Sequence, residues 1–190
     1  MEKVVIAVVS RKGGSGKTTT ALHLAQTLAK AGHDVAVLDT DPEASAIQWA
    51  DGAELAFPVY KPVERRRAEA HQYLIIDTQP NSSKAVGEAA RKATHVIVVA
   101  GANALELDRL VPTLDSLEAS GFEGTYGVLL ARVPGAKSET TQAAIRALEE
   151  AEIPVLGVVP SNAVISDSFQ QSPKRLKEHK EVLTRLQVLQ

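Results

Sequence analysis

The sequence contains no cysteine among its 190 residues, and this absence excludes several kinds of chemistry. Disulfide bonds, thiolate zinc sites, cysteine-held iron–sulfur clusters and cysteine nucleophiles are all impossible. The first apolar run, Val4–Val9, is only six residues long and leads directly into Arg11 and Lys12. It is too short for a signal peptide or a membrane span, so we expect a cytoplasmic protein.

The sequence also lacks a strong charge of either sign. Its formal net charge is -2, from 21 Lys and Arg against 23 Asp and Glu. Such a chain has no global attraction for nucleic acid or anionic lipid, so a polyanionic partner must meet a local patch. No tract rich in Gly, Ser or Pro marks a boundary, and we therefore expect one domain over residues 1–190.

Short apolar runs rich in β-branched residues recur along the chain. Because they do not alternate with polar residues, they are typical of strands buried on both faces of a parallel sheet. These runs are Val4–Val9, Val35–Leu38, Tyr73–Ile76, His95–Val99, Gly127–Leu130 and Val155–Val159, and Phe57–Pro62 is expected to add an edge strand.

Stretches with helical periodicity lie between these runs. They are Lys17–Ala31, Glu43–Ala50, Ser83–Lys92, Glu106–Ala119 and Glu139–Ala151. This alternation predicts parallel strands joined by right-handed crossovers, with helices on both faces. The expected fold class is α/β, a doubly wound and mainly parallel β-sheet flanked by helices, with its ligand at the carboxyl ends of the strands.

A glycine-rich loop connects the first strand to the first helix. Its glycines leave room for several backbone N–H groups to approach a triphosphate. Lys17 is placed to contact the β- and γ-phosphates of ATP, and the Thr18 hydroxyl to ligate Mg²⁺. The expected cofactor-binding residues of the loop are Gly13, Gly14, Ser15, Gly16, Lys17, Thr18 and Thr19. The alternative is a strand–helix turn that binds nothing.

One position departs from the general phosphate-loop pattern, which asks for Gly where this chain has Arg11 followed by a second lysine, Lys12. Residues 12–19 match Lys-Gly-Gly-x-Gly-Lys-Thr-Thr, and through this motif the chain resembles the deviant Walker A (P-loop) ATPases of the ParA/MinD family. In that family the extra lysine contacts the nucleotide of the other subunit. The resemblance implies an ATP-dependent sandwich dimer in which Lys12 acts in trans, as an arginine finger does; the alternative is a solvated loop lysine.

Three carboxylates complete the expected site. Asp39 and Asp41 follow the second apolar run, and the resemblance to the family's Asp-x-Asp-Pro switch implies that Asp41 orients the attacking water. Asp39 would support Mg²⁺ or the loop geometry, and an alternative for Asp41 is a helix N-cap before Pro42. Asp77 ends the third run, where an acid holds Mg²⁺ in phosphate-loop proteins. The expected catalytic residues are Lys12, Lys17 and Asp41, and the expected metal ligands are Thr18, Asp39 and Asp77.

Two further positions resemble the places where family members contact adenine. They are Arg132, near the end of the fifth run of the strand pattern, and Pro160, at the end of the sixth. The resemblance implies that both bind the nucleotide. The five histidines have no metal-ligand spacing, so we expect surface or turn positions for them.

Basic residues gather in two segments, Lys61 with Arg65, Arg66 and Arg67, and Lys174 with Arg175, Lys177, Lys180 and Arg185. The second segment is amphipathic, with Leu and Val along one side. It could close a core, contact the DNA backbone or anchor to a membrane. It has neither Trp nor Phe, which interfacial anchors usually offer, and this disfavours the membrane.

The resemblance spans nearly the whole chain and, with no DNA-reading domain before Val4, indicates a small ParA-type plasmid or chromosome partition ATPase. It implies weak, Mg²⁺-dependent and partner-stimulated ATP hydrolysis to ADP. It also implies non-specific DNA binding by the ATP-bound homodimer, a nucleoid-associated location and a centromere-binding, ParB-like adaptor. The alternative is a MinD-like ATPase that positions the cell-division machinery or another cargo. A metabolic ligase or kinase would need a further substrate pocket, for which 190 residues leave little room.

Overall fold

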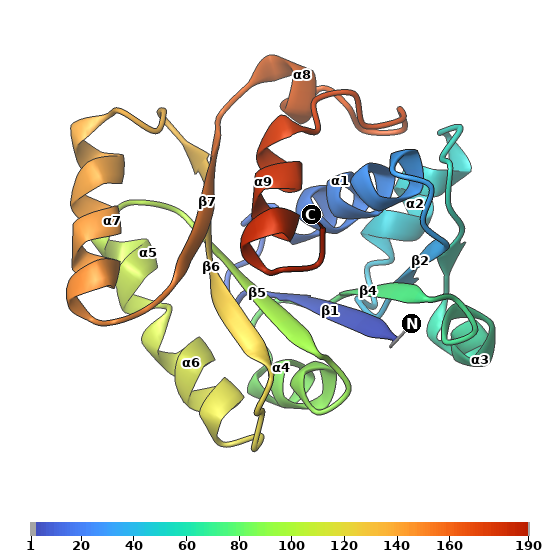
Figure 1. The fold of residues 1–190 in the computed structure, drawn as a ribbon, viewed down its shortest axis with the longest axis horizontal. Helices are drawn as coiled ribbons and strands as arrows, with labels where there is room; N and C mark the ends of the chain where they lie inside the picture. The colour runs from blue at the N-terminus through green and yellow to red at the C-terminus, as the bar shows by residue number, and fades with distance from the viewer. Residues whose placement is uncertain (1–2, 190) are drawn as a thin grey trace.

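The computed structural model describes residues 3–189, which form a parallel sheet between two layers of helices (Figure 1). The seven strands lie in the order β3-β2-β4-β1-β5-β6-β7. Their bounds are β1 Val4–Val9, β2 Val35–Asp39, β3 Val59–Tyr60, β4 Tyr73–Asp77, β5 His95–Ala100, β6 Thr125–Val133 and β7 Val155–Pro160. The doubly wound α/β prediction is confirmed, including the short edge strand β3.

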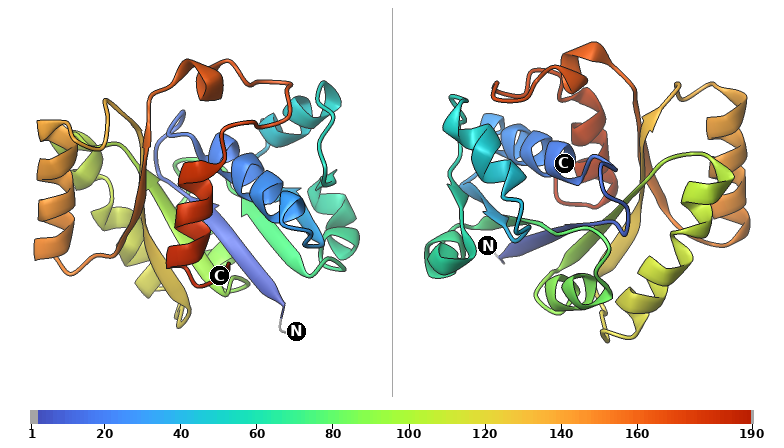
Figure 2. Two further views of the ribbon diagram at one scale, coloured as in Figure 1. Left: turned by 45° about the horizontal axis from the view of Figure 1, so that its top comes forward. Right: turned by 180° about the vertical axis from the view of Figure 1, so that it is seen from behind.

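Helices cover both faces of this sheet (Figure 2). Helices α1, α2 and α9 pack on one face, and α4, α6 and α7 pack on the other. The bounds are α1 Lys17–Lys30, α2 Ser45–Asp51, α3 Arg65–Ala68, α4 Ser83–Ala90, α5 Ala104–Asp108, α6 Val111–Glu118, α7 Glu139–Glu150, α8 Ala163–Ser166 and α9 Lys177–Arg185, with a 3₁₀ turn η1 at Pro62–Glu64.

The central strand explains why the apolar runs are continuous. Ile6 and Val8 of β1 belong to the core under α1, whereas Ala7 and Val9 belong to the core on the opposite face. Side chains of a strand point alternately to the two faces, so a strand covered on both faces has to be apolar at every position.

The predicted single helix Glu106–Ala119 is wrong, because the structure has two short helices, α5 and α6, in its place. Pro112 lies in the first turn of α6. A proline has no backbone N–H to donate and its ring collides with the carbonyl four residues earlier, so it can begin a helix but not continue one. Pro112 therefore indicates, from the sequence alone, that one continuous helix cannot span this segment.

The topology brings three strand ends together. Strand β1 lies between β4 and β5. Strands β2, β3 and β4 are all on one side of β1, and after β4 the chain crosses to β5 on the other side. This reversal makes the end of β1 the switch point of the sheet. Asp77 of β4 is paired in register with Val8 of β1 and with Asp39 of β2. The phosphate loop and the two strand-end carboxylates therefore meet at one edge.

Helix α9 closes the core beside α1, as one of the three alternatives for the last segment predicted. Val182 and Leu183 are fully buried, and Gly157 of β7 leaves room for Val182: a side chain at 157 would lie 3.2 Å from its methyl carbon. The apolar side of α9 is thus already covered by the protein. Across residues 3–189 no helix is both long enough and apolar enough to cross a membrane.

Candidate nucleotide-binding site

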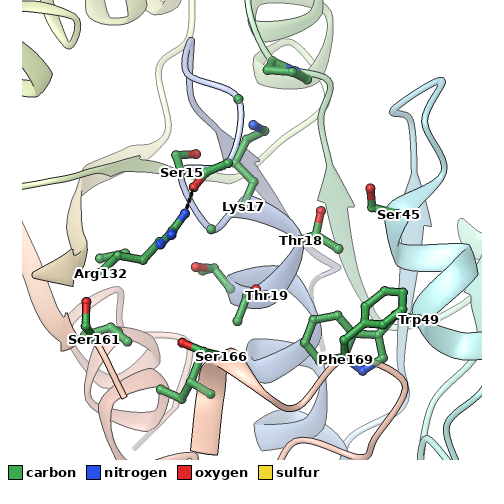
Figure 3. A pocket seen from close by; sticks show the side chains of 18 of the residues that line it. Ser15, Lys17, Thr18, Thr19, Ser45, Trp49, Arg132, Ser161, Ser166 and Phe169 are labelled. Carbon is green, nitrogen blue, oxygen red and sulfur yellow. Dashed lines mark hydrogen bonds between the residues drawn. The ribbon is translucent and has the colours of Figure 1, made fainter. Parts of the chain in front are cut away.

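A pocket of about 540 Å³ opens at the carboxyl ends of the strands (Figure 3). The phosphate loop and the start of α1 form its floor, and residues after β2, at the ends of β6 and β7, and after β7 form its walls. Among the lining residues are all of 13–20, together with Asp41, Trp49, Arg132, Pro160 and Phe169. The predicted nucleotide-binding residues are thus brought to one cavity, although their individual roles stay predictions.

The loop has the backbone geometry that its glycines were expected to allow. Gly14 and Gly16 have φ of 67° and 100°, in the left-handed region where a side chain would be strained. The Lys17 ammonium is buried and donates a hydrogen bond to the carbonyl of Lys12 at 3.2 Å. Burial lowers the pKa of Lys17, while the nearby charges of Asp77 and Asp41 work in the opposite direction. This lysine is a shielded cation at the start of α1.

The Asp39 carboxylate accepts hydrogen bonds from the backbone of the segment that follows β2. One carboxylate oxygen accepts from the N–H of Asp41 at 3.0 Å, and the other accepts from Ala46 and Ile47 at 2.9 and 3.1 Å. The carboxylate therefore satisfies the free N–H groups at the start of α2, where the N-cap residue Ala44 offers no side-chain acceptor. Of the two roles predicted for Asp39, the surroundings favour loop geometry over metal binding.

Asp41 lies at the edge of the pocket, half-buried. The N-cap alternative for this residue is wrong, because α2 begins only at Ser45 and Asp41 instead accepts from the N–H of Glu43 at 3.0 Å. The N–H groups in the first turn of α2 donate instead to Asp39, at the end of the preceding strand β2. Asp41 keeps a carboxylate oxygen available to the pocket.

Asp77 has the opposite surroundings. It is fully buried, and neither carboxylate oxygen has a hydrogen-bond partner among residues 3–189. Burial raises the pKa of Asp77 to about 7, against the effects of the nearby Thr18 hydroxyl and Lys17. A buried, unpartnered carboxylate beside a hydroxyl suits Mg²⁺, which takes oxygen ligands from one or two carboxylates and from the phosphates of the substrate. Asp77 and Thr18 therefore fit the predicted ion.

The segments after β2 and β4 are tied to each other and to β1. Thr40 donates from its N–H and its hydroxyl to the carbonyl of Asp77, at 2.9 and 2.7 Å. The Thr78 hydroxyl donates to the carbonyl of Val8 at 2.8 Å. A shift of either segment would thus be transmitted to the strand that carries the phosphate loop.

Arg132 lies on a β-bulge at the end of β6. The register with β7 shifts between Ala131 and Val133, and Arg132 has φ of 58°, unusual for a residue with a side chain. The bulge turns the side chain onto the phosphate loop, where its guanidinium donates to the carbonyl of Gly14 (Figure 3). Arg132 and Pro160 both line the pocket as predicted, but the Arg132 head lies at the phosphate loop.

Two aromatic residues of the pocket were not identified from the sequence. Trp49 of α2 and Phe169 pack edge to face, with ring centroids 5.7 Å apart (Figure 3). The Trp49 indole N–H donates to the carbonyl of Gln171 at 2.8 Å, which ties α2 to the chain after α8. Phe169 is 50% exposed. Because these two segments lie far apart in the chain, no local pattern indicates that they meet.

The surface positions expected for the histidines are wrong for two of them. His23 of α1 and His179 of α9 are buried, with ring centroids 4.7 Å apart, and His179 also lines the pocket. Burial lowers the pKa of both imidazoles, so both are neutral near pH 7. Helical spacing alone did not reveal this pair because its members come from helices at opposite ends of the chain.

Comparison with known protein families shows to which family this chain belongs. Residues 6–173 match the family described as CbiA, the CobQ/CobB/MinD/ParA nucleotide binding domain. The chain belongs to this family, as its resemblance to ParA/MinD ATPases predicted.

Among named relatives, the maintenance of carboxysome distribution protein A of Gloeobacter kilaueensis is 34% identical over 161 residues, which span 79% of this chain and 73% of the relative. Two relatives called putative replication protein A, from Sinorhizobium fredii and Rhizobium rhizogenes, are 68% and 63% identical but are matched over only 41 residues. This stretch spans 22% of this chain and 10% of each relative.

Solved structures share the fold. A complex of a Cyanothece McdA variant with ATP superposes with a TM-score of 0.80 at 17% identity, covering 100% of this chain and 98% of that one. A plasmid partition protein from Borrelia burgdorferi superposes with a TM-score of 0.72 at 16% identity, covering 98% and 99%. At these identities the structures establish the fold of a P-loop nucleotide-binding protein.

Proposed function

We propose that the protein is a ParA-like ATPase. In this proposal it binds ATP with Mg²⁺, hydrolyses it slowly to ADP, dimerises in the ATP-bound state and binds DNA without sequence preference. A ParB-like, centromere-binding adaptor would connect it to the plasmid or chromosome that it partitions. The observation that carries the proposal is the phosphate loop with two lysines, at a pocket lined by Asp41, with the carboxylate of Asp77 close by and accepting no hydrogen bond from residues 3–189.

Each group of the pocket has a definite task in this proposal. Lys17 and the N–H groups of the loop bind the phosphates, and Asp41 orients water. Asp77 and Thr18 would hold Mg²⁺, which when bound neutralises charge on the β- and γ-phosphates. The base of the nucleotide would lie against the wall of the pocket that includes Pro160.

The basic side of the last segment supports the DNA-binding part of the proposal. The apolar side of α9 is buried in the core, which leaves Lys174, Lys177 and Lys180 exposed. None of these three belongs to an ion pair formed within residues 3–189, whereas Arg175 pairs with Glu178.

In the other basic segment, two of the four cations are paired with acidic neighbours, whereas Lys61 and Arg66 join none of the ion pairs formed within residues 3–189. Arg65 and Arg67 are paired with Glu69 and Glu64. Cations without such partners are the ones that can neutralise phosphates, so the segment that carries α9 is the better candidate for DNA contact.

A salt series of duplex DNA binding tests this function. Three cations on each chain of a dimer predict a slope of log K against log salt of roughly -5, compared with roughly -3 for a single chain. We expect binding with ATP, little binding with ADP, and a large loss in the Lys174→Ala, Lys177→Ala, Lys180→Ala variant. The matched control changes Arg65, Arg66 and Arg67 to Ala and should bind as wild type does.

A second candidate function is a MinD-like or other cargo-positioning ATPase, which the 34% identity to a carboxysome distribution protein favours. Two results would distinguish the candidates. An ATP-dependent dimer that binds no DNA in any nucleotide state would favour the second candidate. DNA binding that does not depend on the nucleotide would contradict the first.

A further inference from the structure

The extra lysine of the phosphate loop is already engaged within its own chain. The Lys12 ammonium pairs with the carboxylate of Glu106 on α5, far along the chain from the loop. The same carboxylate accepts a hydrogen bond from the N–H of Gly101 at 2.8 Å. The Lys12 side chain is 39% exposed and that of Glu106 only 15%. An accessible cation is thus held by a shielded anion.

The structure around Glu106 keeps this carboxylate in place. The Asn103 side chain caps the first turn of α5 by accepting from the N–H of Glu106 at 3.0 Å. A β-carbon at Gly101 would lie 2.7 Å from the carboxyl carbon of Glu106, so a side chain there would displace this carboxylate from its place beside Lys12. Burial alone would raise the pKa of Glu106, but the hydrogen bonds from Lys12 and Gly101 outweigh it and lower the pKa. Glu106 is therefore ionised at neutral pH.

The ion pair lies beside the nucleotide pocket and outside it. Lys12 and Glu106 line a separate cavity of about 310 Å³ between the phosphate loop and the ends of β5 and β6. Of the loop residues described, 13–20 line the nucleotide pocket and Lys12 does not. In the single chain the Lys12 ammonium thus points away from the site that its own loop forms.

We propose that Glu106 is a positioning residue that holds Lys12 outside its own nucleotide pocket and releases it when the phosphates of a second copy compete for the ammonium. This inference rests on the ATP-dependent dimer of the proposed function. A triphosphate carries more negative charge than one carboxylate, so exchange is favourable once the phosphates come within contact distance. Without them, Glu106 keeps Lys12 from contributing to dimer formation.

The size of the effect follows from the exposure of the pair. An ion pair of this kind shifts an equilibrium by roughly 1.5- to 5-fold. Because both chains of a dimer release their lysine, the two factors multiply to roughly 2- to 25-fold in the dimer dissociation constant.

The test is the Glu106→Gln variant, which keeps the shape and the acceptor for Gly101 but removes the charge. Sedimentation with Mg²⁺ and a slowly hydrolysed ATP analogue should show a dimer roughly 2- to 25-fold tighter than wild type. Gly101→Ala, which displaces Glu106, should act in the same direction. The matched control is Asp108→Asn, an exposed carboxylate of the same helix that joins none of the ion pairs formed within residues 3–189, and it should leave the constant unchanged.

A Lys12→Ala background separates positioning from a structural role. There, adding Glu106→Gln should neither tighten nor restore dimerisation, because the lysine to be released is missing. A shift that persists without Lys12, or a wild-type dimer that Glu106→Gln leaves unchanged, overturns the inference while the proposed function stands. If the wild type stays monomeric with the ATP analogue, it is the proposed dimer that fails.

Discussion

The ends of β2 and β4 carry aspartates in the same register, yet their carboxylates have opposite surroundings. Asp39 accepts three backbone hydrogen bonds, whereas the buried oxygens of Asp77 accept none from residues 3–189. A buried carboxylate without partners is costly unless a cation or a proton compensates it. Asp39 thus holds the segment between β2 and α2 in shape, and our proposal assigns Asp77 to the Mg²⁺ ion.

The largest expected effect comes from Asp77→Asn. If Asp77 holds Mg²⁺, this change removes a charged ligand and should lower ATP hydrolysis roughly 10³-fold, since a metal stabilises the transition state by several kcal/mol. A steady-state phosphate-release assay at several Mg²⁺ concentrations measures it. Hydrolysis within about threefold of the wild-type rate would contradict the assignment of Asp77, rather than Asp39, to Mg²⁺.

Asp41→Ala should separate chemistry from binding. Asp41 is half-buried at the pocket edge and is not needed to start α2, so we expect ATP binding to persist while turnover falls roughly 10²-fold. Single-turnover kinetics together with a binding isotherm give both quantities. Wild-type turnover would remove Asp41 from the reaction.

Asp39→Ala should affect folding more than metal binding. Its three N–H donors lose their acceptor, and leaving such groups unsatisfied costs about 1–3 kcal/mol in the free energy of unfolding. Urea denaturation measures the loss, with Asp108→Asn as the exposed control. An unchanged unfolding free energy would show that the carboxylate does not hold α2.

The most gradual effect is a pH dependence that belongs to Asp77. Because burial raises its pKa to about 7, the folded protein retains a proton that the unfolded chain releases near pH 4. Without nucleotide and Mg²⁺, the contribution of Asp77 to stability should therefore fall as pH rises towards 7, by at most about 1.4 kcal/mol per pH unit, and level off above it. The buried imidazoles of His23 and His179, whose pKa is lowered, contribute in the opposite direction over the acidic part of this range. Urea denaturation of wild type and Asp77→Asn from about pH 5 to 8 isolates the contribution of Asp77, because the histidines are the same in both proteins: the wild-type stability minus that of Asp77→Asn should fall as pH rises towards 7.

The phosphate side of the pocket could be predicted from the sequence because its geometry is local. Glycines, Lys17 and Thr18 lie together in the chain, and parallel strands place their carboxyl ends at one edge, which brought Asp39, Asp41 and Asp77 into the prediction. The assignment of one domain stays a prediction. The sequence pattern does not predict which groups bind each aspartate. The hydrogen bonds of Asp39, for example, depend on where α2 begins.

The remaining walls of the pocket depend on contacts between distant segments. The bulge that turns Arg132 onto the loop is a shift of register, and the Trp49–Phe169 pair joins α2 to the chain after α8. Neither leaves a periodic signal in the sequence. The Lys12–Glu106 pair is similar, because its two residues lie 94 positions apart in the chain.

The most direct test of the whole account is a calorimetric titration of ATP, with and without Mg²⁺, into wild type, Asp39→Asn and Asp77→Asn. We predict that all three bind ATP and that Mg²⁺ tightens binding in wild type and in Asp39→Asn, by roughly tenfold, but not in Asp77→Asn. No ATP binding by the wild-type protein, or an Mg²⁺ response that survives in Asp77→Asn and is lost in Asp39→Asn, would contradict the account.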